Sequence, residues 1–238
     1  MRHTYALIIP ALNEAESVGL LLDRIPREMF SQIVVVDNGS QDRTAEVAAA
    51  AGAEVVTEPR RGYGQACMSG IRHIQDGITA VAFMDADLSD NPEDLARMVR
   101  HFDEDRWDML LGSRVLGNPE PGSLTPLQRF GNWLSTRLIA MVWRVRYTDL
   151  GPLRILRRSS LLQMNLRDRT YGWNVEMQAR AAQLGFRVCE LPVRYGRRLH
   201  GHSKISGTVQ GSLRAGIKIL WTILRCCLMP RHEAAGGR

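Results

Sequence analysis

The chain has 238 residues, of which 45% are hydrophobic and 24% are charged, and its formal net charge is +6 at pH 7. This composition excludes an intrinsically disordered chain, because the apolar content is sufficient for the core of a full domain. The 31 basic residues exceed the 25 acidic ones, which favours an anionic partner such as a nucleotide, a lipid phosphate or a nucleic acid.

The four cysteines have neither the spacing of a metal site nor that of a disulfide framework. We therefore expect reduced thiols in a cytosolic protein. No signal peptide is expected, since the apolar stretch near the N-terminus contains Pro10 and ends at Asn13 and Glu14. The late apolar run over residues 217–229 contains two cations and is shorter than the ~20 residues that span a bilayer. We expect no membrane-crossing segment.

In chain order, short apolar runs alternate with segments of helical periodicity. This pattern predicts right-handed strand–helix–strand units and a mostly parallel sheet flanked by helices, which is an α/β fold. The predicted strands are residues 5–9, 33–36, 53–57, 80–84, 108–111 and 186–191. The predicted helices are residues 18–25, 44–51, 65–74, 92–102, 126–142, 176–184 and 208–229.

Two carboxylates follow the strand predicted at 80–84. Asp85 and Asp87 are two residues apart, so in an extended chain both can face one pocket. Close carboxylates repel each other unless a cation lies between them, and Mg²⁺ or Mn²⁺ with a diphosphate is the usual occupant. The alternative is a solvated acidic loop, because residues 91–94 form a favourable helix start. Spacing alone leaves both interpretations open.

Polar residues also follow other predicted strands. Asn13, Glu14 and Asp37 lie after the first two strands, at the edge of an α/β sheet where ligands bind. Each of them alone could be a turn or cap residue. The basic, glycine-rich turn over residues 60–65 precedes a helix and suits a phosphate, because free N–H groups point outward there. It matches neither a Walker loop nor a dinucleotide fingerprint.

The second half contains two apolar and basic helices, predicted over residues 126–142 and 208–229. Each could lie on an anionic membrane surface, or could be an ordinary core helix with a solvated basic face. Residues 194–204 are rich in Arg, His and Lys and contain no acid. Such a segment is usually a solvated loop, yet its glycines and serine would allow it to close over a bound diphosphate.

Six motifs together resemble the inverting family 2 glycosyltransferases of the GT-A fold, and within them the dolichyl-phosphate mannose or glucose synthase-like branch. The motifs are Ile9-Pro10-Ala11-Leu12-Asn13-Glu14, Val35-Val36-Asp37-Asn38-Gly39-Ser40, Arg61-Gly62-Tyr63-Gly64, Asp85-Ala86-Asp87-Leu88, Gly112-Ser113-Arg114 and Arg198-Leu199-His200-Gly201-His202-Ser203-Lys204. The resemblance extends over about residues 4–210 and implies a GT-A domain over 1–207. Its nucleotide-sugar-binding half would be 1–114 and its acceptor half 115–207. An amphipathic helix over 208–230 and a disordered tail over 231–238 would follow.

The resemblance also implies site residues. The nucleotide-sugar site would comprise Pro10, Ala11, Asn13, Glu14, Asp37, Gly64, Asp85, Ala86 and Asp87. Asp85 and Asp87 would hold Mg²⁺ or Mn²⁺, but Ser89 stands where some of these synthases have a glutamine near the metal. The acceptor or its phosphate would meet Arg114, Arg129, Arg154, Glu176, Arg198, Ser203 and Lys204. The catalytic set would be Asp87, Asp149, Arg198 and Lys204.

The expected activity is metal-dependent transfer of a hexose from a UDP-glucose-type or GDP-mannose-type donor to a polyprenyl phosphate. The protein would be cytoplasmic and peripheral on the inner membrane face, with contacts through residues 126–146 and 208–229. A phosphate acceptor is already ionised, whereas a hydroxyl acceptor, on a glycolipid or small molecule, needs a base, with Asp149 first and Glu176 second. A nucleotide-sugar-binding protein without turnover is another alternative. A nucleic-acid binder is disfavoured, since aromatics make up only 6% of the chain.

Overall fold

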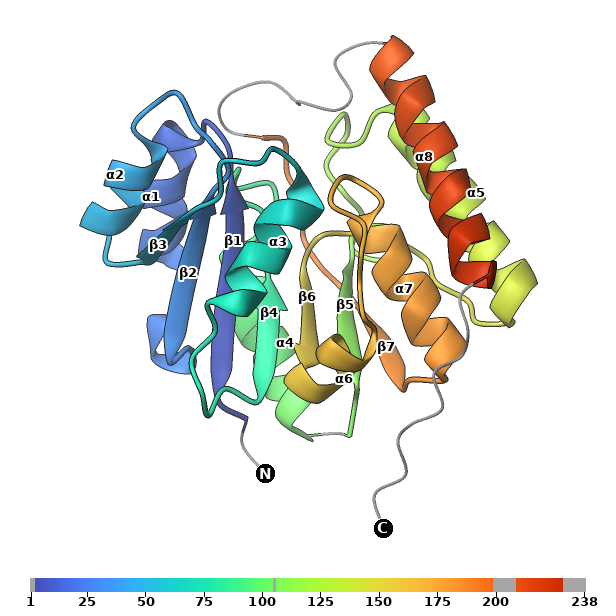
Figure 1. Cartoon of the computed structure of the whole chain (residues 1–238), viewed down its shortest axis with the longest axis horizontal. Helices are drawn as coiled ribbons and strands as arrows, with labels where there is room; N and C mark the ends of the chain where they lie inside the picture. The colour runs from blue at the N-terminus through green and yellow to red at the C-terminus, as the bar shows by residue number, and fades with distance from the viewer. Residues whose placement is uncertain (1–2, 105, 199–208, 229–238) are drawn as a thin grey trace.

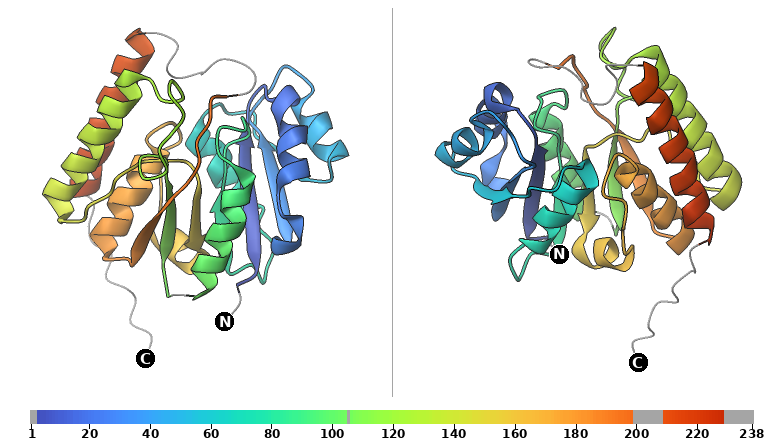
Figure 2. Two further views of the ribbon diagram at one scale, coloured as in Figure 1. Left: turned by 180° about the vertical axis from the view of Figure 1, so that it is seen from behind. Right: turned by 45° about the horizontal axis from the view of Figure 1, so that its top comes forward.

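A central sheet with helices on both faces forms the fold (Figures 1 and 2). The computed structural model describes residues 3–104, 106–198 and 209–228. The strands in this part of the chain are β1 (Tyr5–Ala11), β2 (Gln32–Asp37), β3 (Glu54–Thr57), β4 (Ala80–Phe83), β5 (Met109–Ser113), β6 (Arg154–Arg157) and β7 (Val188–Pro192). The helices are α1 (Ala15–Arg24), the 3₁₀ helix η1 (Arg27–Met29), α2 (Thr44–Ala50), α3 (Tyr63–Arg72), α4 (Pro92–Glu104), α5 (Pro126–Trp143), α6 (Arg158–Gln163), α7 (Trp173–Leu184) and α8 (Val209–Leu228).

The order of the strands across the sheet is β3-β2-β1-β4-β6-β5-β7. The first four strands in this order pair in parallel, and so do β5 and β7. Only β6 among the described strands runs against its neighbours, β4 and β5. The predicted α/β fold with a mostly parallel sheet is therefore confirmed.

Both faces of the sheet are buried, because successive strand residues belong to two different apolar clusters. In β1, Tyr5, Leu7 and Ile9 face one cluster, while Ala6 and Ile8 face the other. The first cluster includes side chains of α1, α2 and α4, and the second includes side chains of α3, α5, α6, α7 and α8. Helices thus cover both faces and leave the carboxyl ends of the parallel strands, at the top of Figure 1, open to ligands.

The two apolar and basic helices lie side by side, since α5 packs on α8 (Figures 1 and 2). α5 starts at a capping box: the Thr125 hydroxyl accepts from the Gln128 N–H, and the Gln128 side chain accepts from the Thr125 N–H. α8 corresponds to the helix predicted over 208–230, whereas the predicted tail over 231–238 lies outside the described residues. Among the described helices, none is both long enough and apolar enough to span a membrane.

Strand β6 is absent from the sequence-based prediction. Arginines interrupt its apolar pattern, yet Arg154 is fully buried in the sheet. Its guanidinium donates to the carbonyl oxygens of Gly151 and Pro152, the latter at 3.3 Å, and to Met177 Sδ at 3.3 Å. Burial lowers the pKa of Arg154. A buried cation needs such hydrogen bonds to offset its loss of water. Because a periodicity rule counts arginine as exposed, it does not detect β6.

Candidate active site

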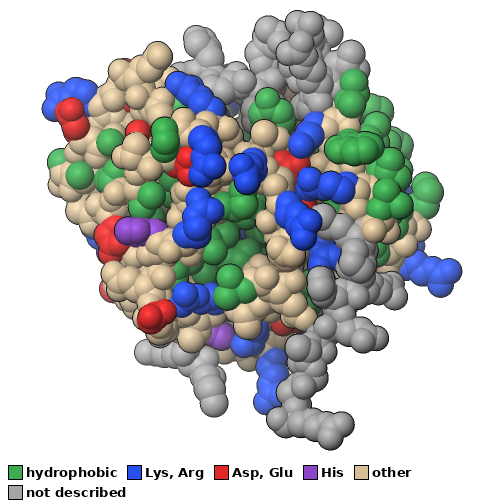
Figure 3. Space-filling view, in the orientation of Figure 1, with side chains coloured by type: hydrophobic (Ala, Val, Ile, Leu, Met, Phe, Trp, Pro, Cys, Tyr) green, Lys and Arg blue, Asp and Glu red, His purple; other side chains and the backbone are tan. Residues whose placement is uncertain are grey.

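A cavity of about 500 Å³ opens at the carboxyl ends of β1 and β4. Seven of the residues predicted to bind the nucleotide sugar line it: Pro10, Ala11, Asn13, Glu14, Asp85, Ala86 and Asp87. They lie close together because the two strands are adjacent and parallel and end at the same edge of the sheet. Figure 3 shows many Lys and Arg side chains on the upper half of this face, as expected for a protein that binds an anion.

The two carboxylates predicted to share a pocket do so. The Tyr63 hydroxyl donates to Asp85 Oδ1 at 2.9 Å. Burial and the nearby charge of Asp87 raise the pKa of Asp85 to about 7. The left-handed backbone of Leu88 (φ 60°) folds the chain so that the Ser89 hydroxyl and N–H both donate to Asp87 Oδ1, the N–H at 2.9 Å. Tyr63 and Ser89 therefore orient one carboxylate each.

This pair fits a hard divalent cation. Two carboxylates in a partly dehydrated cavity repel each other, as the raised pKa of Asp85 reflects, and a cation between them would remove that repulsion. Within the described part of the chain, no group of three or more His, Cys, Asp or Glu residues has a metal-binding arrangement. The remaining ligands would then be water and phosphate oxygens, the usual situation for Mg²⁺.

Arg198 lies at the cavity between two acids. Its guanidinium donates to Glu14 Oε1 at 2.9 Å and contacts Asp87 Oδ2 at 2.7 Å. The side chain is only 27% exposed, so its charge acts within a partly dehydrated site. This position suits the predicted contact with a donor or acceptor phosphate. The predicted partners Ser203 and Lys204 lie outside the described residues.

The basic turn beside the cavity is held by Asn38. The Asn38 side chain donates to the carbonyl oxygens of Glu58 and Arg60, at 2.9 and 2.8 Å, and accepts from the Gly62 N–H at 2.8 Å. Asn38 and Gly62 both line the cavity. The preceding Asp37 is buried and accepts from the Ser40 N–H at 3.2 Å. Asn38, and not the predicted Asp37, thus forms the cavity surface here.

Gly64 also differs from its predicted role. It is buried within α3, and a Cβ at this position would lie 2.1 Å from the Asp168 carbonyl oxygen. The structure therefore requires glycine here because another part of the chain packs against it. The prediction that Gly64 binds the nucleotide sugar is corrected to a packing role.

Glu58 fixes the base of this turn, and its ionisation should contribute to stability. It accepts hydrogen bonds from the Ser69 hydroxyl, from Gln65 Nε2 at 2.8 Å and from the Arg60 N–H at 3.0 Å. The side-chain bonds from Ser69 and Gln65 lower its pKa from 4.5 to about 2 against the opposing effect of burial. Because the folded-state pKa is depressed, the stabilisation is complete above about 4.5 and is lost as pH falls towards about 2.

We therefore expect Glu58→Gln to lower the free energy of unfolding at neutral pH by about 2 kcal/mol, the scale of hydrogen bonds to a charged group. The difference from the wild type should shrink as pH falls below about 4.5, and urea unfolding at several pH values measures it. Glu46→Gln is the matched control, because Glu46 is 68% exposed in its pair with Arg43. If the wild type remained more stable than Glu58→Gln by the same free energy at low pH, the ionised Glu58 would not be the source of the stabilisation.

On the acceptor side, Asp149 pairs with Arg114. Two bonds of 2.8 Å join Arg114 Nε to Asp149 Oδ2 and Arg114 Nη2 to Asp149 Oδ1. Asp149 also accepts from the Arg114 and Leu150 N–H groups, and it is 1% exposed. Its lone pairs are thus engaged and its carboxylate is buried. This geometry suits Asp149 to orienting Arg114, and its role as the base for a hydroxyl acceptor stays a prediction.

Arg114 lies at a second cavity, of about 720 Å³, beside α5. Four arginines line it: Arg114, Arg129, Arg137 and Arg146. The apolar side chains of Val115, Leu124 and Trp133 line the same cavity. The predicted phosphate contacts Arg114 and Arg129 are therefore brought together, in a cavity that is both basic and apolar.

Two other predicted acceptor residues are buried away from both cavities. Arg154 is enclosed in the sheet, as described above. Glu176 is 0% exposed; Glu176 Oε1 pairs with Arg225 at 2.7 Å, and Glu176 Oε2 accepts from the N–H groups of Arg167 and Asp168. Neither side chain can reach an acceptor, so the predictions that these residues bind it, and that Glu176 is a second candidate base, are wrong.

Sequence reasoning missed the cavity residues Tyr63, Thr170 and Tyr171. Tyr63 lies inside the motif over residues 61–64, so that motif could have identified it. Thr170 and Tyr171 come from the irregular segment between α6 and α7, which has neither periodicity nor motif.

Comparison with known proteins places these features in context. Residues 6–166 match the family model described as "Glycosyl transferase family 2". An uncharacterized glycosyltransferase of Mycobacterium bovis is 39% identical over 225 residues, which cover 92% of this chain and 96% of the relative. An undecaprenyl-phosphate mannosyltransferase of Micrococcus luteus is 30% identical over 238 residues, which cover 93% of this chain and 97% of that relative.

Solved structures resemble the fold. Glucosyl-3-phosphoglycerate synthase from Mycobacterium tuberculosis, in complex with Mn²⁺, UDP and phosphoglyceric acid, matches with a TM-score of 0.74. The match covers 96% of this chain and 80% of that one at 20% sequence identity. At this identity the similarity extends to the arrangement of the sheet and helices only.

Proposed function

Because this chain belongs to glycosyl transferase family 2 and is a glycosyltransferase, we propose that it moves a hexose from a nucleoside diphosphate sugar to a polyprenyl phosphate. The observation that carries the choice of acceptor is the engagement of Asp149 by Arg114. A hydroxyl acceptor needs a carboxylate to take its proton, whereas an ionised phosphate needs only cations to hold it. The relative named as an undecaprenyl-phosphate mannosyltransferase supports the same acceptor class.

The donor occupies the cavity of about 500 Å³ in this proposal. Asp85 and Asp87 hold Mg²⁺ or Mn²⁺, which when bound neutralises the negative charge that develops on the departing diphosphate. Tyr63 and Ser89 keep the two carboxylates in place. Arg198, beside Asp87 and Glu14, supplies a further positive charge to the phosphates. The UDP and Mn²⁺ bound in the complex of glucosyl-3-phosphoglycerate synthase support this donor chemistry.

The acceptor phosphate occupies the four-arginine cavity. Asp149 fixes the guanidinium of Arg114 through two hydrogen bonds, so this cation is already oriented before the acceptor binds. Attack on the sugar carbon from the face opposite the diphosphate would invert the configuration there. Glu14 and Asp87 keep Arg198 on the donor side, so separate cations hold the two phosphates.

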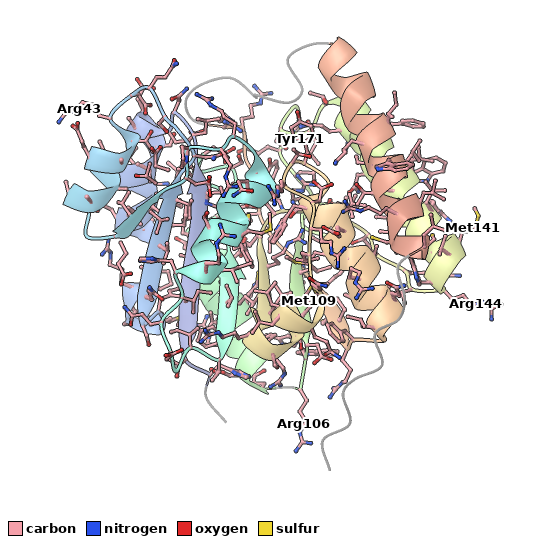
Figure 4. All side chains as sticks on the ribbon, viewed as in Figure 1. Arg43, Arg106, Met109, Met141, Arg144 and Tyr171 are labelled. Atoms are coloured by element: carbon pink, nitrogen blue, oxygen red, sulfur yellow. The ribbon has the colours of Figure 1, made fainter. Side chains whose placement is uncertain are left out.

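The lipid tail follows the exposed apolar face of α5 and α8. Among the described side chains of these helices, ten large apolar ones are exposed: Leu127, Phe130, Trp133, Met141, Val142, Ile217, Leu220, Trp221, Leu224 and Leu228. Figure 3 shows hydrophobic side chains gathered over these helices, and Figure 4 shows Met141 pointing away from the molecule. We place this face on the cytoplasmic surface of an anionic membrane, with the arginines at headgroup level.

The purified protein should label undecaprenyl phosphate in anionic vesicles when supplied with Mn²⁺ and radiolabelled UDP-glucose or GDP-mannose. Transfer should decrease as salt rises, because the Debye length falls from about 10 Å at 0.1 M to about 3 Å at 1 M. A parallel reaction with phosphoglycerate as the acceptor tests the second candidate, a phosphorylated hydroxyl compound like that in the structural neighbour. Labelled phosphoglycerate without labelled lipid would overturn the proposed acceptor.

A further inference from the structure

A cluster of charged side chains joins α8 to α7 and to the segment before it. Lys218 Nζ lies 2.9 Å from Asp168 Oδ2, and Arg225 Nη2 lies 2.7 Å from Glu176 Oε1. The Asp168 and Glu176 side chains are 0% exposed. The Thr222 hydroxyl, from the same face of α8, donates to the Lys218 carbonyl oxygen at 2.8 Å and lies 3.4 Å from Asp168 Oδ2. The cations of α8 therefore compensate two carboxylates that would be costly to bury alone.

The same two carboxylates shape residues 167–172. Glu176 Oε2 accepts from the N–H groups of Arg167 and Asp168, at 3.0 and 2.6 Å. Asp168 Oδ1 accepts from the N–H and the hydroxyl of Thr170, at 2.8 and 3.0 Å. A Cβ on Gly172 would lie 2.5 Å from Asp168 Oδ2. The segment is thus folded around carboxylate oxygens and has little room to shift.

This segment forms one wall of the donor cavity. Thr170 and Tyr171 line the cavity, and Figure 4 places Tyr171 in the loop above α7. The Gly64 N–H donates to the Thr170 carbonyl at 3.3 Å, and the Gln65 N–H donates to the Arg169 carbonyl at 2.9 Å. Gly64 and Gln65 follow Tyr63 in the first turn of α3, so the segment also supports the residue that donates to Asp85.

We propose that Lys218 and Arg225 are positioning residues for the donor site. Through Asp168 and Glu176 they hold the wall formed by Thr170 and Tyr171 in the conformation that binds the nucleotide. The proposal rests on the proposed function, because it assigns the nucleotide to this cavity. Burial opposes the ionisation of Asp168, yet hydrogen bonds from Lys218 and Thr170 keep its pKa below the usual value, as required for a charged partner.

The test measures nucleotide affinity by calorimetry, with UDP and GDP as probes, each with Mn²⁺. The double substitution Lys218→Met and Arg225→Met should raise the Kd of the preferred nucleotide by about tenfold, or about 1.4 kcal/mol. Lys218→Arg should stay close to the wild-type Kd, because it keeps the charge. Arg106→Met is the matched control, since Arg106 is exposed and points away from the molecule (Figure 4).

A purely structural role would lower Tm and leave Kd unchanged, and that result in a folded variant would overturn the proposal. Hydrogen exchange on the wild-type protein gives a second test that needs no substitution. Nucleotide with Mn²⁺ should increase the protection of residues 167–172 and of residues 218–225 together, because coupling between sites is reciprocal. If the nucleotide protected residues 167–172 but not residues 218–225, the proposed role of Lys218 and Arg225 would also be overturned. A wild-type protein that binds neither nucleotide would instead refute the proposed function.

Discussion

Asp87→Asn is expected to lower the rate of sugar transfer by about 10³-fold, or about 4 kcal/mol in the activation barrier. The substitution removes one of the two negative charges that would hold the divalent cation, and it also removes a partner of Arg198. The side chain keeps nearly the same size, and its oxygen can still accept from Ser89. Initial rates with saturating donor measure the loss.

The same variant should lose the dependence of nucleotide affinity on Mn²⁺. Calorimetry with and without the cation measures this effect independently of turnover. Asp23→Asn is the matched control, because Asp23 is an exposed carboxylate of α1 that does not line the donor cavity. If the wild-type protein bound the nucleotide with the same Kd with and without Mn²⁺, then Asp85 and Asp87 would not hold the cation.

Arg114→Met should lower the free energy of unfolding by about 3–5 kcal/mol, the cost of leaving a buried carboxylate without its partner. Asp149 is 1% exposed, and the Arg114 guanidinium supplies two of its hydrogen bonds. Denaturant unfolding measures the change. Arg129→Met is the comparison, since Arg129 lines the same cavity but is exposed. A loss no greater than that of Arg129→Met would show that the pair contributes little to folding.

Asp149→Asn then separates positioning from base catalysis. A positioning role predicts that the KM for the acceptor rises while kcat falls by less than about tenfold, because the phosphate attacks without a base. A general base would instead cost at least about 10²-fold in kcat. The pH profile of kcat should keep its shape in the variant if Asp149 takes no proton.

The donor side of the site could be predicted because it depends on local sequence. Asp85 and Asp87 face one cavity since they are two residues apart after a strand, and Glu14 joins them because β1 and β4 are adjacent and parallel. Apolar runs and turn residues are sufficient to place such loops at one edge. Arg198 does not follow from the positions of the strands. It was predicted only from the motif over residues 198–204.

The remaining features depend on contacts between distant residues. Arg154 is buried where its guanidinium also reaches Met177 of α7, 23 residues away, and no rule based on periodicity anticipates that contact. Glu176 has the sequence context of a helix start, but Arg225 of α8 determines its surroundings. Thr170 and Tyr171 line the cavity because the carboxylates of Asp168 and Glu176 accept hydrogen bonds from the segment that contains them. Sequence alone does not reveal such pairings.

The reversed strand β6 has a consequence for synthesis of the chain. In the finished sheet β5 pairs only with β6 and β7, both of which leave the ribosome after it. β1 to β4 can assemble as soon as they emerge, whereas β5 must wait with both hydrogen-bonding edges open. A nascent chain ending at residue 114 therefore carries β5 without either of the strands that pair with it in the finished sheet.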